Sequence, residues 1–449
     1  MNLNMKKILA ITCGLLIGSS ANAQTYTLQQ LKDSAIQHNA SRRAATYDLE
    51  IARQQRKEAF TKFFPNISAT GFWFNTSDGM AKMEINPSEY IPSNIMPVLQ
   101  RVLPMDMLVA LSNPVGLSLM KKGTLAAVTA LQPIFAGGQI VNGNKLARIG
   151  EEVSLLQLQM AENEIDKKTE EYYWQIVTLT EKMKTIHAVE SLLNSICKDV
   201  DVAVRAGVAL HNDLLQVKLR MNDIEGQRLK LENAVGILKL TLSQHCRLKT
   251  STFEVKTPEA GHLTLPPAVD GLQVEALPEY QLLQKQVDAT NLQKKMAIGQ
   301  HLPSVAVGAS YNYHNLLDSD HTTGMIFATI SIPISNWWGG AHEIKRKKLE
   351  QQKAIEQLEN NAQMLKIRMQ KAWNDVYEAY QQMEIAQKGI EQAEENLRQN
   401  QNFYKAGTAK MSDLLEAQML FQQACDRHTD AFANYQNKLL EYKQAIGNN

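Results

Sequence analysis

Two segments of this chain, 200 positions apart, are closely similar. Residues 205–215 read RAGVALHNDLL, and residues 405–415 read KAGTAKMSDLL. Earlier segments match in the same way, because ALQPIFAGG at 130–138 corresponds to SIPISNWWGG at 331–340. Each half therefore has the same predicted order: a helix, a strand that starts near a proline, a connection, a second strand, a Gly-Gly pair, a very long helix, an Ala-Gly turn and a return helix. An internal duplication of this length constrains the whole fold.

Each half contains one very long helix with a coiled-coil seam. In the second half the seam residues alternate steps of three and four: Ile355, Leu358, Ala362, Leu365, Met369, Ala372, Val376, Ala379, Met383, Ala386, Ile390, Ala393 and Leu397. The first half keeps this register from Tyr172 to Val204. Such a period of 3.5 residues indicates helices packed side by side. A helix of about 65 residues is roughly 100 Å long, and return helices at about 213–246 and 413–446 predict that each arm folds back.

Four segments are predicted as strands long enough for a membrane: about 65–76, 123–134, 303–314 and 322–334. Ser304 to His314 alternates apolar and polar residues, which is typical of a strand with one apolar face. About ten residues suffice for a tilted strand to cross a bilayer. Aromatic residues lie near the strand ends, as at a membrane interface: Phe72, Trp73, Phe74, Trp337 and Trp338. A soluble sandwich fits the alternation equally well, but so few strands between such long arms argue against it.

Four strands are too few to close a barrel. An open sheet edge would leave backbone groups unpaired in hydrocarbon, so identical chains with cyclic symmetry must complete a spanning sheet. Two copies would give a barrel filled by side chains, whereas three copies would leave a lumen. We therefore predict an α+β membrane protein, in which an internally duplicated chain contributes four β-strands to a trimeric 12-stranded barrel and adds a long antiparallel coiled coil.

The repeat and an export signal give the predicted domain organisation. Residues 1–23 have a short basic region, an apolar run and small residues before the expected cleavage site, which predicts a signal peptide. Cys13 lies inside the apolar run and is not expected to carry a lipid anchor. Residues 24–247 form the first repeat with its turn at 205–212, residues 248–278 form a linker or equatorial segment, and residues 279–449 form the second repeat with its turn at 405–412.

The sequence shows no catalytic or metal-ligating constellation. The formal net charge is +1, which argues against a nucleic-acid partner. Cys197, Cys246 and Cys425 have neither the spacing of a disulfide framework nor that of a metal site. The histidines are scattered, and a structural or solvated role is expected for them. We therefore predict no enzyme activity, no cofactor and no bound metal.

The strand-to-helix junctions and the turns resemble those of the TolC family of outer-membrane efflux ducts. The residues that carry the resemblance are QPIF and GG at 132–138, PIS and WWGG at 333–340, the RAGVA and KAGTA turns with the DLL that follows each, and the end of the chain at 442–447. The resemblance covers nearly the whole predicted mature chain. It implies a homotrimer with a barrel in outer-membrane lipid and a helical tunnel through the periplasm. It also implies that the tip binds a periplasmic membrane-fusion adaptor and, through it, an inner-membrane transporter.

The predicted function is therefore the exit duct of a tripartite efflux or type I secretion system. Two alternatives stay open: a passive porin-like channel, and a secreted coiled-coil scaffold or adhesin. The connection at about 75–123 is much longer than its counterpart at about 315–322 and is rich in proline and apolar residues. In this topology we expect it on the extracellular side as a surface-exposed cap.

The turns carry the predicted site residues. Gly207 and Gly407 permit the positive φ angle that ends a long helix sharply. The resemblance implies that the adaptor docks on the turns, through Arg205, Gly207, Val208, Leu210, Lys405, Gly407 and Thr408.

The resemblance also implies a gate at the start of the last helix. Asp413 and Glu416 match the positions where the family has acidic rings at the tunnel entrance. Tyr404 and Asp213 match the pair that ties the helical hairpins shut, and Lys410 lies one position from the family's basic partner. An alternative is that Asp413 with Glu416, and Asp213 with Gln216, form capping boxes at the helix starts.

Overall fold

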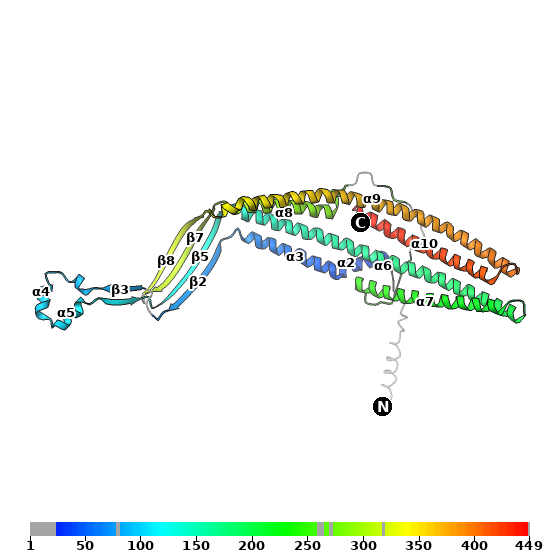
Figure 1. The fold of residues 1–449 in the computed structure, drawn as a ribbon, viewed down its shortest axis with the longest axis horizontal. Coiled ribbons are helices and arrows are strands. Elements are labelled where there is room, and N and C mark those ends of the chain that lie inside the picture. Colours follow the sequence, from blue (N-terminus) through cyan, green and yellow to red (C-terminus); the bar gives the residue numbers. More distant parts are fainter. Residues whose placement is uncertain (1–23, 78–80, 258–264, 269–272, 317–318, 448–449) are drawn as a thin grey trace, which may run out of the picture. The chain divides into compact units, whose positions relative to one another are not determined.

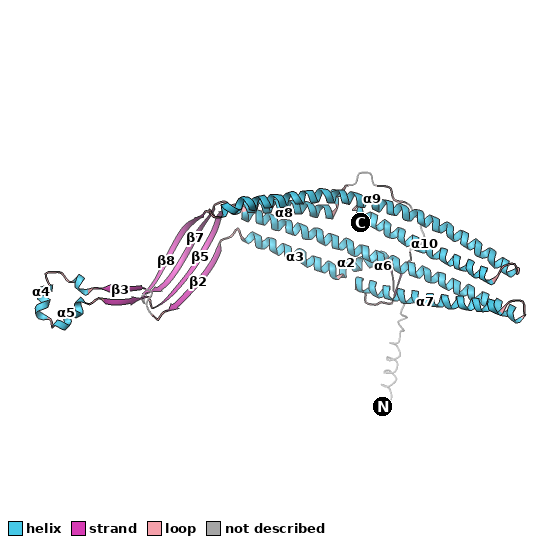
Figure 2. Cartoon of the chain, viewed as in Figure 1, coloured by secondary structure: helices cyan, strands magenta, loops and turns pink. Residues whose placement is uncertain are grey.

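The computed structural model describes residues 24–77, 81–257, 265–268, 273–316 and 319–447, and the predicted signal peptide lies outside these residues. The chain forms two compact units, whose elements are labelled in Figure 1 and coloured by type in Figure 2. A helical unit comprises Met1–Ala52, Glu151–Val287 and Ala354–Asn449, and a strand unit comprises Arg53–Gly150 and Asp288–Lys353. Each unit takes segments from both halves of the chain, so the compact units do not coincide with the sequence repeats.

Two long helical hairpins account for most of the chain. Helix α6 (Gln139–Arg205) is followed by α7 (His211–Cys246), and α9 (Asn336–Lys405) is followed by α10 (Met411–Ala445). Helices α6 and α9 contain 67 and 70 residues, so each is roughly 100 Å long. Both halves have the very long helix and the return helix that the heptad seam indicates.

Shorter elements precede the strands in both halves. Helices α2 (Leu28–His38) and α3 (Ala40–Thr61) come before the first long strand, and η2 (Val274–Ala276) and α8 (Pro278–Gln300) come before the third. Helix α2 begins with a capping box, because Thr27 Oγ1 accepts from the Gln30 N–H at 3.3 Å and Gln30 Oε1 accepts from the Thr27 N–H at 2.9 Å. Strand β1 (Gln24–Tyr26) pairs in parallel with β6 (Phe253–Val255).

The hydrophobic core of the helical unit follows the heptad seam in separate clusters. One cluster packs α2 against α6 and α7 around Leu31 and Cys246, and another packs α9 against α10 around Val376 and Tyr435. The seam is buried unevenly, because Val376 is fully buried whereas Ile355 is 36% exposed. Part of the apolar seam therefore stays open to solvent in the single chain. None of the described helices combines the length and apolar character of a membrane-spanning helix.

Four antiparallel strands form one sheet in the order β2-β5-β7-β8. Their bounds are Asn66–Asn75 for β2, Lys122–Ala136 for β5, Ser304–Leu316 for β7 and Ser319–Ser331 for β8. The two halves of the chain meet at the centre, where β5 pairs with β7. In the described part of the chain, β2 and β8 each pair on one side only within this sheet. Strand β8 ends earlier than predicted because Pro333 has no N–H for a ladder.

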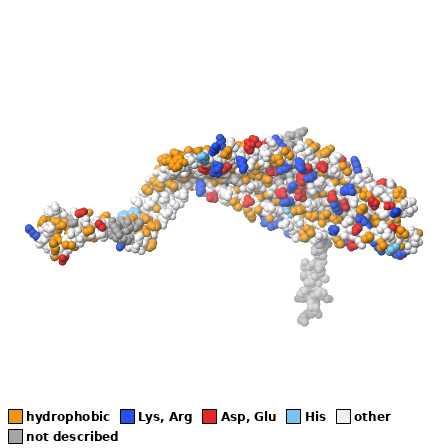
Figure 3. Space-filling model, in the orientation of Figure 1, with side chains coloured by type: hydrophobic (Ala, Val, Ile, Leu, Met, Phe, Trp, Pro, Cys, Tyr) orange, Lys and Arg blue, Asp and Glu red, His pale blue; other side chains and the backbone are white. Residues whose placement is uncertain are grey.

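The two faces of this sheet differ in polarity. One face exposes large apolar side chains: Ile67, Trp73, Val128, Tyr311, Ile326 and Ile330. The other face carries many small polar side chains: Ser68, Thr70, Thr129, Ser310, Asn312 and Thr323. In the view of Figure 3, charged side chains lie along the helices and are sparse over these strands. Ile326 is 89% exposed. An exposed apolar face of this kind indicates contact with a membrane or with a partner protein.

The segment between β2 and β5 is structured, which the sequence analysis missed. Strands β3 (Ala81–Ile85) and β4 (Val115–Leu119) pair antiparallel, and between them lie η1 (Pro87–Tyr90), α4 (Met96–Val102) and α5 (Met105–Ser112). Helices of 7 and 8 residues are too short to show a periodicity in the sequence. Their apolar side chains are largely exposed, with Val102 at 74% and Met105 at 75%.

The strand unit contains a close backbone crossing between the two repeats. Gly137 follows β5 with a φ of +59°, and Gly299 lies at the end of α8. A Cβ added at Gly299 would lie 2.2 Å from Gly137 O, and one added at Gly137 would lie 2.1 Å from Gly299 O. No side chain fits at either position without a backbone shift, so these glycines allow the β5–α6 junction and the α8–β7 junction to touch.

We predict that Gly299→Ala destabilises the protein by about 1–3 kcal/mol, the usual range for overpacking. Thermal unfolding in detergent measures this as a lower Tm. The matched control is Gly236→Ala in α7, where a Cβ meets nothing within 4 Å and the helix gains up to about 1 kcal/mol. A Tm for Gly299→Ala equal to or above that of the unmodified protein would refute the importance of the crossing.

Candidate functional site at the helical turns

Both long helices end in the same hydrogen-bonded turn. At the first turn the Gly207 N–H donates to Val204 O at 3.0 Å, and the Val208 N–H donates to Ala203 O at 3.0 Å. At the second turn the corresponding bonds run from Gly407 to Tyr404 O at 3.0 Å and from Thr408 to Phe403 O at 2.9 Å. This pair of bonds defines a Schellman motif, which places the residue after the helix in the left-handed conformation.

Glycine is required at both turns by the backbone angle and not by lack of space. Gly207 has a φ of +73° and Gly407 a φ of +70°, whereas a Cβ added at either position would meet nothing within 4 Å. Another residue type held at this angle costs on the order of 1–3 kcal/mol. The long hairpins can absorb such a local cost because their cores lie elsewhere.

The surface of the turns exposes several large apolar side chains. Large side chains there have high exposed fractions: Val208 at 80%, Leu210 at 70%, Val202 at 66% and Phe403 at 52%. The other predicted docking side chains, Arg205, Lys405 and Thr408, are also exposed. Val202 and Phe403 were missed in the sequence, although their position off the heptad seam could have singled them out.

Asp213 and Asp413 occupy equivalent places, and neither is the N-cap residue that the alternative of capping boxes with Gln216 and Glu416 requires. Helices α7 and α10 begin at His211 and Met411, so each aspartate is the third residue of its helix and does not precede it. Asp413 Oδ2 accepts from the Lys410 N–H at 3.1 Å, and Asp213 Oδ2 accepts from the Leu210 N–H at 3.3 Å. The aspartates therefore reach back to the residue before the helix. Glu416 lies one turn further along α10 and is exposed.

An apolar cluster behind the turns joins all four long helices. Its buried members are Ile196 and Val200 of α6, Leu214 and Val217 of α7, Leu397 of α9, and Met411, Leu414 and Ala417 of α10. Tyr404 packs against this cluster. Burial raises the pKa of Tyr404, and the nearby charge of Asp213 raises it further. The structure thus brings Tyr404 of one hairpin close to Asp213 of the other, while the Lys410 side chain is exposed.

A buried polar network crosses between the same hairpins and was missed in the sequence. Arg220 of α7 donates from Nε to Gln418 Oε1 at 3.0 Å and from Nη2 to Gln422 Oε1 at 2.8 Å, both on α10. Gln422 Nε2 in turn donates to Gln227 Oε1 at 2.8 Å. Gln418 is fully buried and Gln422 is 5% exposed. Burial lowers the pKa of Arg220 while the Asp223 charge raises it. In the sequence, the only indication of this network was the position of Gln418 and Gln422 beside apolar seam residues of α10.

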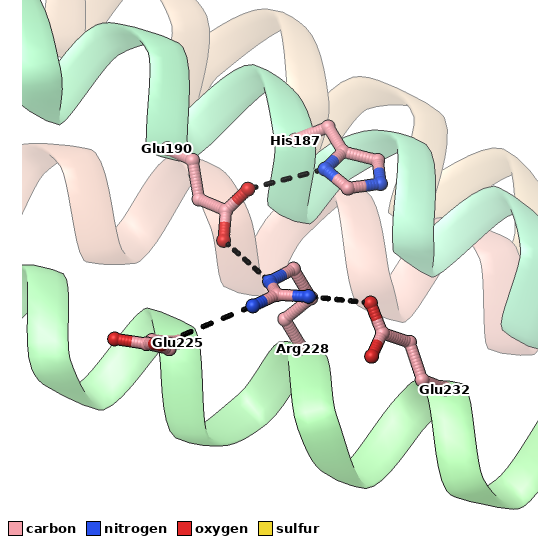
Figure 4. Close-up of polar contacts among 5 residues, drawn as sticks. All are labelled: His187, Glu190, Glu225, Arg228 and Glu232. Carbon is pink, nitrogen blue, oxygen red and sulfur yellow. Dashed lines mark hydrogen bonds and ion pairs between the residues drawn. The ribbon is translucent and has the colours of Figure 1, made fainter.

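A second charged network lies on the surface of the α6–α7 hairpin, as Figure 4 shows. Arg228 of α7 donates from Nε to Glu190 of α6 at 3.1 Å and from Nη1 to Glu232 at 2.5 Å, and Glu225 lies 3.9 Å away. His187 Nδ1 lies 3.1 Å from the other Glu190 oxygen. The hydrogen bond to Glu232 raises the pKa of Arg228 most, and the negative charges of Glu232, Glu190 and Glu225 raise it further. The network joins the two helices of one hairpin and leaves an acidic surface around a single arginine.

The comparisons with known proteins give one family and one fold. The family model described as outer membrane efflux protein matches residues 278–448. None of the curated proteins compared with the chain matches it. The outer membrane protein VceC of Vibrio cholerae shares 16% identity with a TM-score of 0.72, and the match covers 94% of this chain and 96% of VceC.

Two further solved structures share the fold. For the CmeC outer membrane channel of Campylobacter jejuni the identity is 14% and the TM-score is 0.75, with 94% of this chain and 85% of CmeC covered. For the MtrE outer membrane channel of Neisseria gonorrhoeae in its open state the identity is 16% and the TM-score is 0.70, with 94% of this chain and 88% of MtrE covered.

The long helical hairpins and the four-stranded antiparallel sheet of this chain thus have the fold seen in these three solved structures. Residues 278–448 of the chain are similar to the outer membrane efflux protein family. The predicted resemblance to the TolC family is confirmed.

We predict that replacing both Gly207 and Gly407 by Leu abolishes export while assembled protein remains in the outer membrane. The physical reason is that the strained turns misplace the exposed docking side chains, whereas the added atoms meet open space. Cell-based export together with heat-modifiability on gels measures both properties. The control is Gly226→Leu in α7, another position with nothing within 4 Å. Unchanged export in the double variant would show that the turns do not dock a partner.

Proposed function

We propose that three copies of this chain form a 12-stranded barrel in the outer membrane, continued by a coiled-coil tunnel in the periplasm. The observation that carries this proposal is the four-stranded sheet, with an exposed apolar face, a polar opposite face and partners on one side only for β2 and β8. Pairing of β8 with β2 of the next copy would satisfy both edges. The apolar faces would then meet lipid and the polar faces would line a lumen.

The assembled protein acts as the exit duct of a tripartite efflux or type I secretion system, a function supported by the family match. Its periplasmic partner, a membrane-fusion adaptor, docks on the turns. Val208, Leu210 and Phe403 give this surface an apolar centre, and Arg205 and Lys405 give it a positive rim. An interface of this composition suits a protein partner, because exposed apolar side chains gain free energy when a partner removes them from water.

Two alternatives predict different behaviour. A passive porin-like channel would need no contacts that hold the hairpins together, whereas the Arg220 network and the apolar cluster behind the turns join them. A secreted scaffold or adhesin would expose the apolar sheet face to water. The duct is therefore favoured by the contacts between hairpins and by the polarity of the sheet.

The assembly is tested by mass measurement in detergent, where we predict three chains per particle. The reason is that β2 and β8 are the edge strands of the described sheet, and three copies give twelve strands, enough to leave a lumen. In cells lacking the protein, restored export that depends on an adaptor would distinguish the duct from a porin. A monomer that inserts stably into membranes, or equal transport without any adaptor, would contradict the proposal.

We further predict that the pair Asp413→Asn and Glu416→Gln reduces cation selectivity in planar bilayers. In a trimer these carboxylates form rings around the axis, and such rings attract cations. Asparagine at 413 keeps an oxygen that can accept from the Lys410 N–H, so the change removes charge while preserving the start of the helix. Glu391→Gln, an exposed position on α9, is the control and should leave selectivity unchanged. Equal selectivity in all three proteins would place the gate elsewhere.

Closure of the tip is predicted to depend on the contacts between hairpins. Tyr404→Phe with Asp213→Ala should raise single-channel conductance, and Arg220→Met should raise it more, because Gln418 and Gln422 then lose a buried charged donor. Hydrogen bonds to charged groups contribute about 1.5–3 kcal/mol, which corresponds to a rise of roughly tenfold or more in the open population.

The matched control is Arg228→Gln, since Arg228 bonds only within the α6–α7 hairpin in the contacts of Figure 4. It should lower stability slightly and leave conductance unchanged. If Arg220→Met and Arg228→Gln behave alike in correctly assembled protein, the network between hairpins does not restrain opening.

A further inference from the structure

Two histidines face each other at the end of the β7–β8 hairpin. His314 of β7 and His321 of β8 are directly opposite in the strand register. Their ring centroids lie 5.4 Å apart, with the ring planes tilted by 40°. The pair belongs to the polar face of the sheet, beside Asn312 and Thr323 in the same register.

This separation matches the geometry of two imidazoles on one metal ion. A zinc-to-nitrogen bond is about 2.1 Å and tetrahedral coordination sets the angle between two ligands, so two imidazole rings bound to one ion have centroids roughly 5 Å apart. Residues directly opposite on neighbouring strands keep their Cβ atoms about 5 Å apart, which holds both rings at this distance. The strand register itself therefore preorganises the pair.

The two rings differ in the partners of their nitrogen atoms. His321 Nε2 lies 3.1 Å from Ser319 Oγ, which leaves its Nδ1 for a metal and gives the ring an orienting partner. His314 Nδ1 is shielded from solvent and has no hydrogen-bond partner among the described residues. No protein group in the described chain thus fixes its tautomer, and Nε2 can act as the ligand.

The neighbouring carboxylate is not part of the pair. Asp320 accepts from Tyr313 Oη at 2.8 Å and from Asn315 Nδ2 at 2.5 Å, and alternation along β8 places it on the opposite face from His321. No group of three or more ligating side chains that could hold a metal is found in the described part of the chain. The pair would therefore supply two ligands, and water would complete the coordination.

We propose that His314 and His321 form a two-histidine binding site for a divalent transition-metal ion such as Zn²⁺, Ni²⁺ or Cu²⁺. Imidazole ligands favour these ions over Mg²⁺ and Ca²⁺, which prefer oxygen. A bound ion would link the ends of β7 and β8 and place positive charge on the polar face of the sheet. Binding by each chain does not depend on trimer formation, so this site and the proposed duct can fail separately.

The site is tested on full-length protein purified through a tag without histidine. Zn²⁺ is titrated by calorimetry, and Cu²⁺ bound at one equivalent per chain is examined by electron paramagnetic resonance for coupling to two nitrogens. We expect one site per chain, with affinity lowered by roughly tenfold or more in His314→Gln or His321→Gln, or about 1.4 kcal/mol per tenfold change. Ca²⁺ should not compete.

Three controls separate the pair from other effects. His342→Gln removes an exposed histidine of α9 and should leave binding unchanged. Asp320→Asn alters the adjacent carboxylate and should also leave it unchanged. Heat-modifiability and circular dichroism establish that the two glutamine variants are folded.

Retention of the site in folded His314→Gln and His321→Gln, or an equal loss in His342→Gln, would overturn the proposal. So would a Cu²⁺ spectrum without coupling to two nitrogens. Metal binding with unaltered export would leave the site established and independent of the duct.

Discussion

The unpaired backbone edges of two strands are the main constraint on how this protein can assemble. Strands β2 and β8 each pair on one side only within the four-stranded sheet of the described chain, and an unpaired strand edge is a template for another chain. In hydrocarbon an unpaired edge is costly enough to exclude an open sheet. The same sheet exposes Ile326 and Ile330 at 89% and 70%, so it suits lipid on that face. A closed ring of identical chains would pair the edges of β2 and β8 and would also turn the apolar face of each sheet toward lipid.

The long helices also have surface that the single chain leaves uncovered, and here it is apolar side chains and not backbone groups. Along α9 the seam is tightly buried at Met369, Val376 and Ala379, whereas two apolar residues off the seam, Met364 and Ile385, are 55% and 61% exposed. A single pair of hairpins covers only part of the apolar surface that these helices carry. Further copies beside them would cover the rest, as the staves of a cylinder do. The sheet edges and the helix surfaces therefore both favour an assembly of several chains.

Much of this architecture could be predicted because it depends on local chemistry that repeats. The heptad steps predict α6 and α9, and the two Ala-Gly turns predict Gly207 and Gly407 at positive φ. Alternation from Ser304 to His314 predicts β7. Each of these features is fixed by residues close together in the chain. Each also occurs in both halves, so the pattern in one half supports the same structural prediction in the other.

The features that could not be predicted depend on the exact strand register and on which helix faces meet. The Gly137–Gly299 crossing, the Arg220 network and the His314–His321 pair arise from the strand register and from helix packing. No spacing in the sequence encodes them. The starts of α7 and α10 were misplaced because an aspartate can accept a backbone N–H from before the helix or from within it. The short helices α4 and α5 have too few residues for a periodic pattern.

The contacts between the two hairpins combine an apolar layer near the turns with a polar layer further from them. The apolar layer around Leu214 and Leu414 favours closure because separation would expose it to water. The polar layer around Arg220 and Gln418 acts differently, since buried polar groups are stable only while they remain paired. On separation water replaces those partners, so the polar layer opposes opening less than an apolar layer of equal area. In the proposed duct, the Arg220 layer would therefore hold the two hairpins together less strongly than the apolar layer does.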